Sequence, residues 1–159
     1  MLLICAATSL AAPKMKTVDI GKTRLEVDLP AEMIAENDGN DALLAYLPYK
    51  AFVTLRFTVL SINAPVKGNA RSGVDFVKKK AAENKQQLFL LDDRCFYQET
   101  REAELDGEKT IQHFIYVGYE QFTVVIYCSI LSRMKDDPAV VKVLEYTGPA
   151  IRSLHKKIL

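Results

Sequence analysis

Residues 95–131 decide the fold, and they read CFYQETREAELDGEKTIQHFIYVGYEQFTVVIYCSIL. Asp106 and Gly107 form a dipeptide that is typical of a tight β-hairpin turn, so they predict paired strands over residues 95–105 and 108–117. After a second turn near residues 118–120, apolar residues recur at every second position of the next strand. The stretch therefore predicts a three-stranded antiparallel meander.

The predicted turns also set the positions of the two cysteines in the meander. The Asp106-Gly107 turn places Cys95 opposite Gly118, and the second turn places Cys128 opposite about Thr110. At about 3.4 Å per residue the two thiols are then roughly 25 Å apart along the strands, whereas a disulfide allows a Cα separation of about 7 Å. We therefore expect no disulfide between them.

Alternating polarity predicts further strands upstream of the meander. Leu25, Val27 and Leu29 share one face of a short segment whose other face is charged, which is typical of a half-buried strand. The predicted upstream strands are residues 17–20, 24–29, 42–49, 52–62 and 87–91. Residues 31–36 are expected to form a short helical turn or an irregular stretch.

Two segments have the periodicity of amphipathic helices. Residues 73–86 follow Ser72, which has an acidic residue three positions later, as in a capping box. The second segment starts at Pro138 and carries one apolar stripe to the end of the chain, with an expected kink at Gly148-Pro149. Because strands and helices are segregated, we predict an α+β fold: an antiparallel β-sheet covered by an amphipathic helix and a long kinked C-terminal helix.

Size and composition are those of one globular domain. The 159-residue chain has no internal repeat and no long linker, so residues 13–159 are predicted to be a single α+β domain. Its 21 Lys and Arg nearly balance 20 Asp and Glu, which leaves a formal net charge of +1. Since a dedicated nucleic-acid binder carries a strongly basic surface, we expect no nucleic-acid partner.

Residues 1–12 are apolar and end in small residues, as the core and cleavage site of a signal peptide do. No charged residue precedes the apolar stretch, so it resembles a truncated signal peptide. We expect a periplasmic or secreted bacterial protein; the alternative is a cytoplasmic protein in which these residues form a buried first element. The stretch is shorter than the roughly 20 residues of a membrane-spanning helix, and we expect no integral membrane segment.

Residues that could carry chemistry are few. No phosphate-binding, dinucleotide-binding, nucleophile-elbow or zinc-protease motif occurs, the three cysteines form no CxxC pair and the two histidines lie far apart. We therefore expect no catalytic residue, no metal and no cofactor. His113 is interpreted as a neutral core histidine with one backbone partner and Cys128 as an inert inward-facing thiol. His155 is interpreted as a cation in the last turn of the C-terminal helix, with no carboxylate partner near it in the sequence.

The element order, the segment LEVDLP at Leu25 to Pro30 and the closing segment PAIRSLHKKI at Pro149 to Ile158 resemble the PsbP-like or Mog-type α/β/α sandwich superfamily. Its members include photosystem extrinsic subunits, a Ran-binding import factor, DcrB-type periplasmic proteins and relatives that chaperone type VI secretion effectors. The resemblance implies an accessory or binding protein, and it assigns no site residue.

Two functions follow from these observations. The first is a non-catalytic protein-binding accessory, chaperone or immunity-type factor, whose candidate interaction loop carries Lys67, Asn69 and Arg71. The alternative is a small-molecule binding protein that uses a cleft between the sheet and the helix over residues 138–159. An enzyme based on Cys128 or His113 ranks last.

Overall fold

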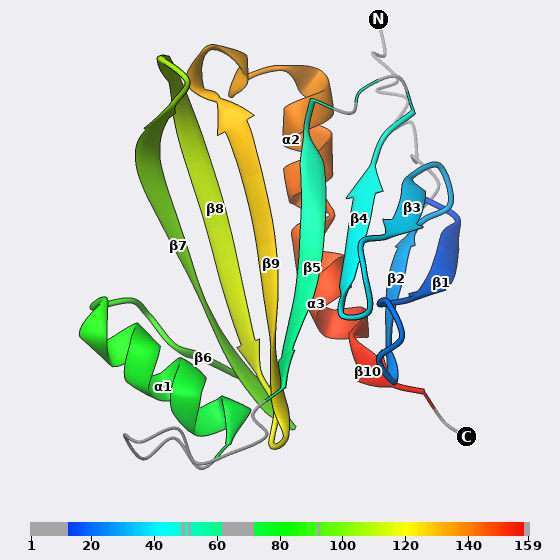
Figure 1. The fold of residues 1–159 in the computed structure, drawn as a ribbon, viewed down its shortest axis with the longest axis vertical. Helices are drawn as coiled ribbons and strands as arrows, with labels where there is room; N and C mark the ends of the chain where they lie inside the picture. Colours follow the sequence, from blue (N-terminus) through cyan, green and yellow to red (C-terminus); the bar gives the residue numbers. More distant parts are fainter. Residues whose placement is uncertain (1–12, 49, 51, 62–71, 92, 158–159) are drawn as a thin grey trace, which may run out of the picture.

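The structure is a computed structural model, and it describes residues 13–48, 50, 52–61, 72–91 and 93–157. Its strands form a three-stranded sheet in the order β1-β2-β10 and a seven-stranded sheet in the order β3-β4-β5-β9-β8-β7-β6 (Figure 1). All pairings are antiparallel, and the α+β fold is confirmed. The predicted leader and the predicted interaction loop lie outside the described residues.

The elements follow one another along the chain in the predicted segregated order, with two strands that were not predicted, β3 and β10. The strands are β1 (Met15–Asp19), β2 (Leu25–Pro30), β3 (Ile34–Asn37), β4 (Ala42–Tyr46), β5 (Thr54–Ser61), β6 (Phe89–Leu91), β7 (Arg94–Leu105), β8 (Glu108–Gly118), β9 (Phe122–Leu131) and β10 (His155–Lys156). The helices are α1 (Gly73–Glu83), the short 3-10 helix η1 (Ser132–Met134), α2 (Pro138–Glu145) and α3 (Thr147–Ser153).

The predicted meander is present as β7, β8 and β9. Cys95 pairs with Gly118, as the Asp-Gly turn predicted. The second turn lies later than predicted, because the Tyr119 N–H donates to the Phe122 carbonyl at 2.9 Å and the two rings stack at 4.5 Å, which extends the pairing beyond Gly118. As a result Cys128 pairs with His113, and the prediction that it faces Thr110 was wrong.

Both cysteines of the meander are buried, free thiols, as expected. They also belong to different clusters of the core. Cys95 packs with residues of α1, such as Val77 and Ala81, whereas Cys128 belongs to the cluster that contains Val140 and Val143 of α2. The two thiols therefore lie on opposite faces of the large sheet, which excludes a disulfide more firmly than their separation along the strands does.

One other prediction was wrong, and the predicted kink of the C-terminal helix is present but at a different residue. The expected helical turn at residues 31–36 is in part strand β3, because Ile34 to Asn37 pair with the free edge of β4. The C-terminal helix breaks at Tyr146, before Pro149 rather than at it, so that Pro149 lies in the first turn of α3, where its missing N–H costs little. Helix α3 then ends at Ser153, and the chain continues as β10.

The large sheet is covered on both faces. Figure 1 shows α1 beside the ends of β6 and β7, with α2 and α3 on the other side of the sheet, behind β5 and β9. The main core lies on the α2–α3 side, where side chains of β5, β8 and β9 meet those of the helices and of β2. None of the helices within the described ranges is long and apolar enough to cross a lipid bilayer.

Helix α1 touches the sheet backbone directly. Ser72 caps it, accepting a hydrogen bond from the Asp75 N–H at 3.1 Å, as predicted. Next to the cap, a Cβ atom placed on Gly73 would lie 2.0 Å from the Phe122 carbonyl oxygen, and one on Gly118 would lie 2.4 Å from the Gly73 oxygen. The two glycines therefore allow a contact that no side chain could fit.

Candidate functional site

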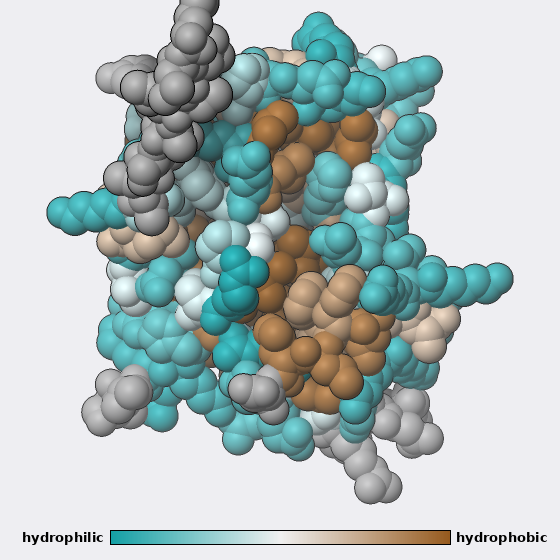
Figure 2. Space-filling model, turned by 180° about the vertical axis from the view of Figure 1, so that it is seen from behind, coloured by the Kyte–Doolittle hydropathy of each residue, from teal (hydrophilic) through white to brown (hydrophobic). Residues whose placement is uncertain are grey.

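A cleft of about 330 Å³ opens between the large sheet and the C-terminal helices. It lies on the face that Figure 2 shows, where hydrophobic residues gather in a hollow bordered by hydrophilic ones. Its lining residues are Leu55, Gln98, Glu99, Thr100, His113, Phe114, Ile115, Ile126, Cys128, Leu144 and Thr147. Its volume is within the range of small-ligand pockets, about 300–1,000 Å³.

The pairing of β8 with β9 builds the floor of the cleft. His113 lies opposite Cys128 and Ile115 lies opposite Ile126, so these four side chains share one face of the sheet. Ile115, Ile126 and Cys128 are buried, whereas His113 is only half-buried. The floor is therefore apolar with one imidazole exposed on it.

The end of α2 and the start of α3 form the wall facing this floor, through Leu144 and Thr147. Glu32, in the turn between β2 and β3, anchors the wall from outside. Its carboxylate accepts a hydrogen bond from the Tyr146 hydroxyl at 2.6 Å and lies 2.9 Å from the Lys142 ammonium group. On the side of β7 the cleft is open, because Gln98 and Thr100 are exposed.

His113 is the polar centre of the cleft. Its Nδ1 lies 3.1 Å from the Thr100 hydroxyl, across the β7–β8 pair. Burial lowers the pKa of His113 below its usual value, so the ring is neutral at pH 7. The prediction of a neutral imidazole agrees with this, but the predicted backbone partner was wrong: a threonine side chain takes that place, and the ring lines a cleft rather than the core.

Cys128 lies beside His113 but is poorly suited to nucleophilic chemistry. The residue is 2% exposed, and burial raises the pKa of its thiol to about 12. Because the thiolate is the reactive form, this thiol stays inert near neutral pH. Within the described ranges, no group of three or more His, Cys, Asp and Glu side chains could hold a metal ion.

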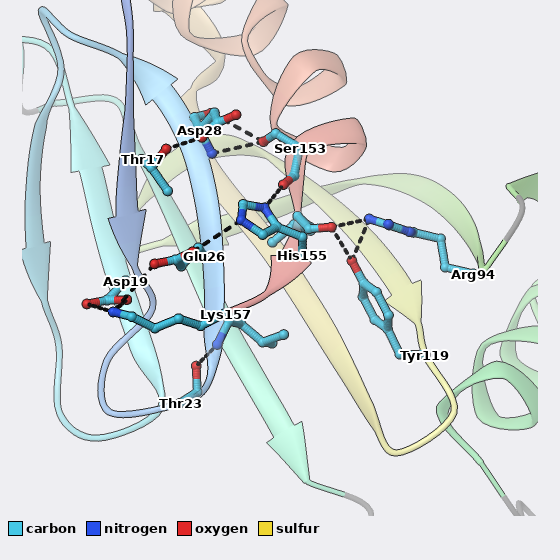
Figure 3. Close-up of polar contacts among 12 residues, drawn as sticks. Thr17, Asp19, Thr23, Glu26, Asp28, Arg94, Tyr119, Ser153, His155 and Lys157 are labelled. Atoms are coloured by element: carbon cyan, nitrogen blue, oxygen red, sulfur yellow. Dashed lines mark hydrogen bonds and ion pairs between the residues drawn. The ribbon is translucent and has the colours of Figure 1, made fainter. Parts of the chain in front are cut away.

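A set of contacts that we call the C-terminal latch holds α3 against the sheet (Figure 3). It consists of Arg94, Tyr119 and the backbone carbonyl of Leu154. The Arg94 guanidinium donates to that carbonyl and, at 2.7 Å, to the Tyr119 hydroxyl, which itself donates to the same carbonyl at 3.1 Å. The latch thereby satisfies a carbonyl group at the end of α3.

His155 lies next to the latch, in a different place from the one expected. It is in β10 rather than in a helix, and its Nε2 lies 3.1 Å from a carboxylate oxygen of Glu26 (Figure 3). No carboxylate lies close to His155 in the sequence, and its partner comes from the distant strand β2. Lys157 follows and contacts Asp19 at 2.9 Å, so the end of the described chain is tied to both β1 and β2.

The structure brings His113 and Cys128 together on the floor of the cleft. His155 lies elsewhere, next to the C-terminal latch and beside Glu26. Sequence reasoning missed Thr100, Gln98 and the latch. The register set by the Asp106-Gly107 turn could have indicated Thr100, because this register places Thr100 opposite His113. Arg94 and Leu154 are 60 residues apart, and no local pattern links them.

Comparisons with known proteins show the fold alone. No family model and no curated protein matches the chain. A crystal structure from Bacteroides thetaiotaomicron VPI-5482 matches with a TM-score of 0.64 and 16% identity, over 90% of this chain and 48% of the other. This chain thus spans about half the length of that protein.

A second solved structure is similar over nearly the whole chain. It is the solution structure of cyanobacterial PsbP (CyanoP) from Synechocystis sp. PCC 6803, with 13% identity, a TM-score of 0.40 and coverage of 96% of this chain and 98% of that one. At these identities the likeness extends to the fold and not to a function.

Proposed function

We propose that this protein is a non-catalytic binding protein whose cleft holds one small molecule with both polar and apolar parts. The observation that carries the proposal is the cleft itself: a volume of about 330 Å³, an apolar floor from β8 and β9, and a polar side formed by Gln98, Thr100 and His113. Ligand sites are commonly concave and mainly apolar, with a small number of placed polar groups. The position of the cleft, between the sheet and the C-terminal helices, also supports the small-molecule alternative considered from the sequence.

The chemistry of the cleft favours binding over catalysis. A thiol–imidazole pair needs a thiolate, and burial keeps Cys128 protonated. The imidazole of His113 is held by the hydroxyl of Thr100 rather than by a carboxylate that would stabilise its charged form. Both side chains therefore suit a site that holds a molecule without transforming it.

Blocking the cleft is expected to abolish binding of a small apolar probe. Naphthalene fits the volume, and its intrinsic fluorescence reports transfer from water into an apolar site. In Thr100→Trp, an exposed side chain at the open edge is replaced by a ring that can fold over the floor. We expect it to weaken naphthalene binding by at least about tenfold, as measured by fluorescence titration.

The matched control is Glu104→Trp. Glu104 is exposed on the same strand, four residues further along, about 14 Å away at the usual rise per residue, and it is not part of the lining. We expect this variant to bind naphthalene like the wild type. Absence of naphthalene binding to the wild type, or equal binding by both variants, would contradict a ligand site in the cleft.

A second candidate function, binding another protein as an accessory, chaperone or immunity-type factor, is favoured by the edge of the large sheet. Strand β6 covers β7 only at residues 94–96, and no other described strand pairs with the same edge of β7. At this edge Leu90 is 71% exposed and Leu91 is 37% exposed. An exposed strand edge beside apolar side chains is a typical place for an added strand.

For this second function, Leu90→Lys is expected to reduce the capture of a partner by about tenfold, because the charge opposes burial of the edge. The measurement is a quantitative pull-down from the native host, with the wild type and the variant in parallel. Glu104→Trp again serves as the control, since it changes a residue outside β6. Equal recovery of the same partner by wild type and Leu90→Lys would argue against this edge.

A further inference from the structure

We propose that the ligand of the cleft is an uncharged amphipathic molecule, and that His113 selects it by hydrogen bonding to a hydroxyl or amide group at its polar end. This inference rests on the proposed function and makes it more specific. It follows from three properties of the described lining. These are the absence of an unpaired charged side chain, the hydrogen-bonding capacity of the neutral His113 ring, and the division of the cleft into a polar and an apolar side.

Among the described residues, no charged group in the lining is available to a charged ligand. The described residues that line the cleft include no Lys or Arg, and the one carboxylate among them belongs to Glu99. Glu99 is already bound on the α1 side of the sheet. It accepts a hydrogen bond from the Asn84 amide at 3.0 Å and another from the Arg101 guanidinium.

A ligand carboxylate or phosphate would therefore enter without a cation, and a ligand ammonium group without a free anion. Burial of an unpaired charge costs far more than burial of a neutral polar group that keeps its hydrogen bonds. The lining thus selects against charge of either sign.

The His113 ring offers one hydrogen bond to a ligand. Its Nδ1 is taken by Thr100, and no described side chain is within hydrogen-bond distance of Nε2. In a neutral imidazole, Nε2 donates when Nδ1 accepts from the threonine hydroxyl, and it accepts when Nδ1 donates. A hydroxyl or a primary amide can satisfy both arrangements, because each of these groups has a donor and an acceptor.

The rest of the cleft takes the apolar part of the ligand. Leu55, Ile115, Ile126 and Leu144 lie on the side away from the exposed edge of β7, where Gln98 and Thr100 are. A volume of about 330 Å³ compares with about 30 Å³ for one water molecule in the liquid. The cleft therefore accommodates a molecule of about ten non-hydrogen atoms.

A matched ligand series tests the inference on the full chain. Nonan-1-ol, nonanoate and nonylammonium each have nine carbon atoms in an unbranched chain, and at pH 7 their polar ends are neutral, anionic and cationic. By isothermal titration below their micelle concentrations, we expect the alcohol to bind at least about tenfold more tightly than either ion. Nonanoate or nonylammonium binding as tightly as the alcohol would overturn the inference.

Two substitutions test the role of His113 independently. His113→Phe removes the hydrogen bond and is expected to weaken nonan-1-ol binding by about tenfold relative to the binding of naphthalene, which has no polar group. His113→Gln retains a donor and an acceptor, and is expected to keep most of the affinity. Unchanged affinity of His113→Phe for nonan-1-ol would contradict the assignment.

The controls separate the inference from the proposed function. Gln112→Leu changes the neighbouring residue of β8 on the opposite face, and should bind all the ligands like the wild type. If naphthalene binds and nonanoate competes with nonan-1-ol on equal terms, the cleft is a ligand site and the inference fails alone. If neither naphthalene nor any member of the series binds, both fail. If His113→Phe does not fold, the series on the wild type decides.

Discussion

Gly73→Ala is expected to lower the free energy of unfolding by about 3 kcal/mol or more, one of the two largest effects of a single substitution that we predict for this protein. The added Cβ would lie 2.0 Å from the Phe122 carbonyl oxygen and 2.4 Å from that of Tyr119. Both atoms belong to the backbone of the β8–β9 turn, which cannot move aside as a flexible side chain can.

The helix must then move away from the turn, and other contacts are lost with it. The Val74 N–H donates to the Tyr119 carbonyl at 3.0 Å, so a shift of α1 breaks a hydrogen bond at its first turn. Alanine in place of glycine normally favours a helix by about 0.5–1 kcal/mol, which is too little to offset the collision. Urea unfolding followed by circular dichroism measures the difference.

Gly148→Ala is the matched control for this prediction. Gly148 also lies in a helix, but a Cβ there would meet only the flexible end of the Arg152 side chain, at 3.7 Å. We expect no loss of stability, and a gain of up to about 1 kcal/mol from the restricted unfolded chain. Gly73→Ala unfolding within about 0.5 kcal/mol of the wild type would show that α1 does not pack against the turn as described.

Arg94→Ala is expected to destabilise the protein by about 3 kcal/mol, because it removes the centre of the C-terminal latch. The Arg94 side chain is only 12% exposed, and its guanidinium lies 4.8 Å from the centre of the Tyr119 ring. Without Arg94, two groups lose a charged hydrogen-bond donor: the hydroxyl of Tyr119 and the carbonyl of Ile151, which lies 3.4 Å from the guanidinium. Water reaches this place poorly and does not replace the donor.

Lysine and a surface arginine provide the comparisons. Arg94→Lys keeps the charge but not the planar set of donors, and is expected to recover only part of the loss. Arg133→Ala removes an exposed arginine whose guanidinium lies 3.6 Å from Glu108, and should change stability by less than about 0.5 kcal/mol. The rate of hydrogen exchange at the α3 amides should rise in Arg94→Ala. Equal stability of the Arg94→Ala and Arg133→Ala variants would contradict the role of the latch.

The sequence predicts those parts of this fold that depend on local chemistry. Asp106 and Gly107 both have positive φ angles, 52° and 80°, as the predicted hairpin turn requires, and such a turn fixes the register of its strands. The second turn has no such dipeptide. Its position depends on the stacking of Tyr119 on Phe122, which is a matter of packing, and the predicted register was therefore wrong there.

The candidate site was less predictable, because its parts come from distant segments. Strand alternation could place His113 on the face that α2 covers, but only the true register places it beside Cys128. The hydrogen bond to Thr100 follows from the β7–β8 register and could have been found. The wall formed by Leu144 and Thr147 depends on how α2 and α3 pack, for which no local pattern exists.

The small sheet has a consequence for the synthesis of the chain. Strand β2 forms hydrogen bonds with β1 on one edge and with β10 on the other, and the contact from Lys157 to Asp19 spans 138 residues. Until β10 has been synthesised, one edge of β2 has no partner strand. An unpaired strand edge can pair with strands of other chains. In the folded protein this edge is covered by β10, a strand of only two residues, so local fraying of β10 would be enough to expose the edge again.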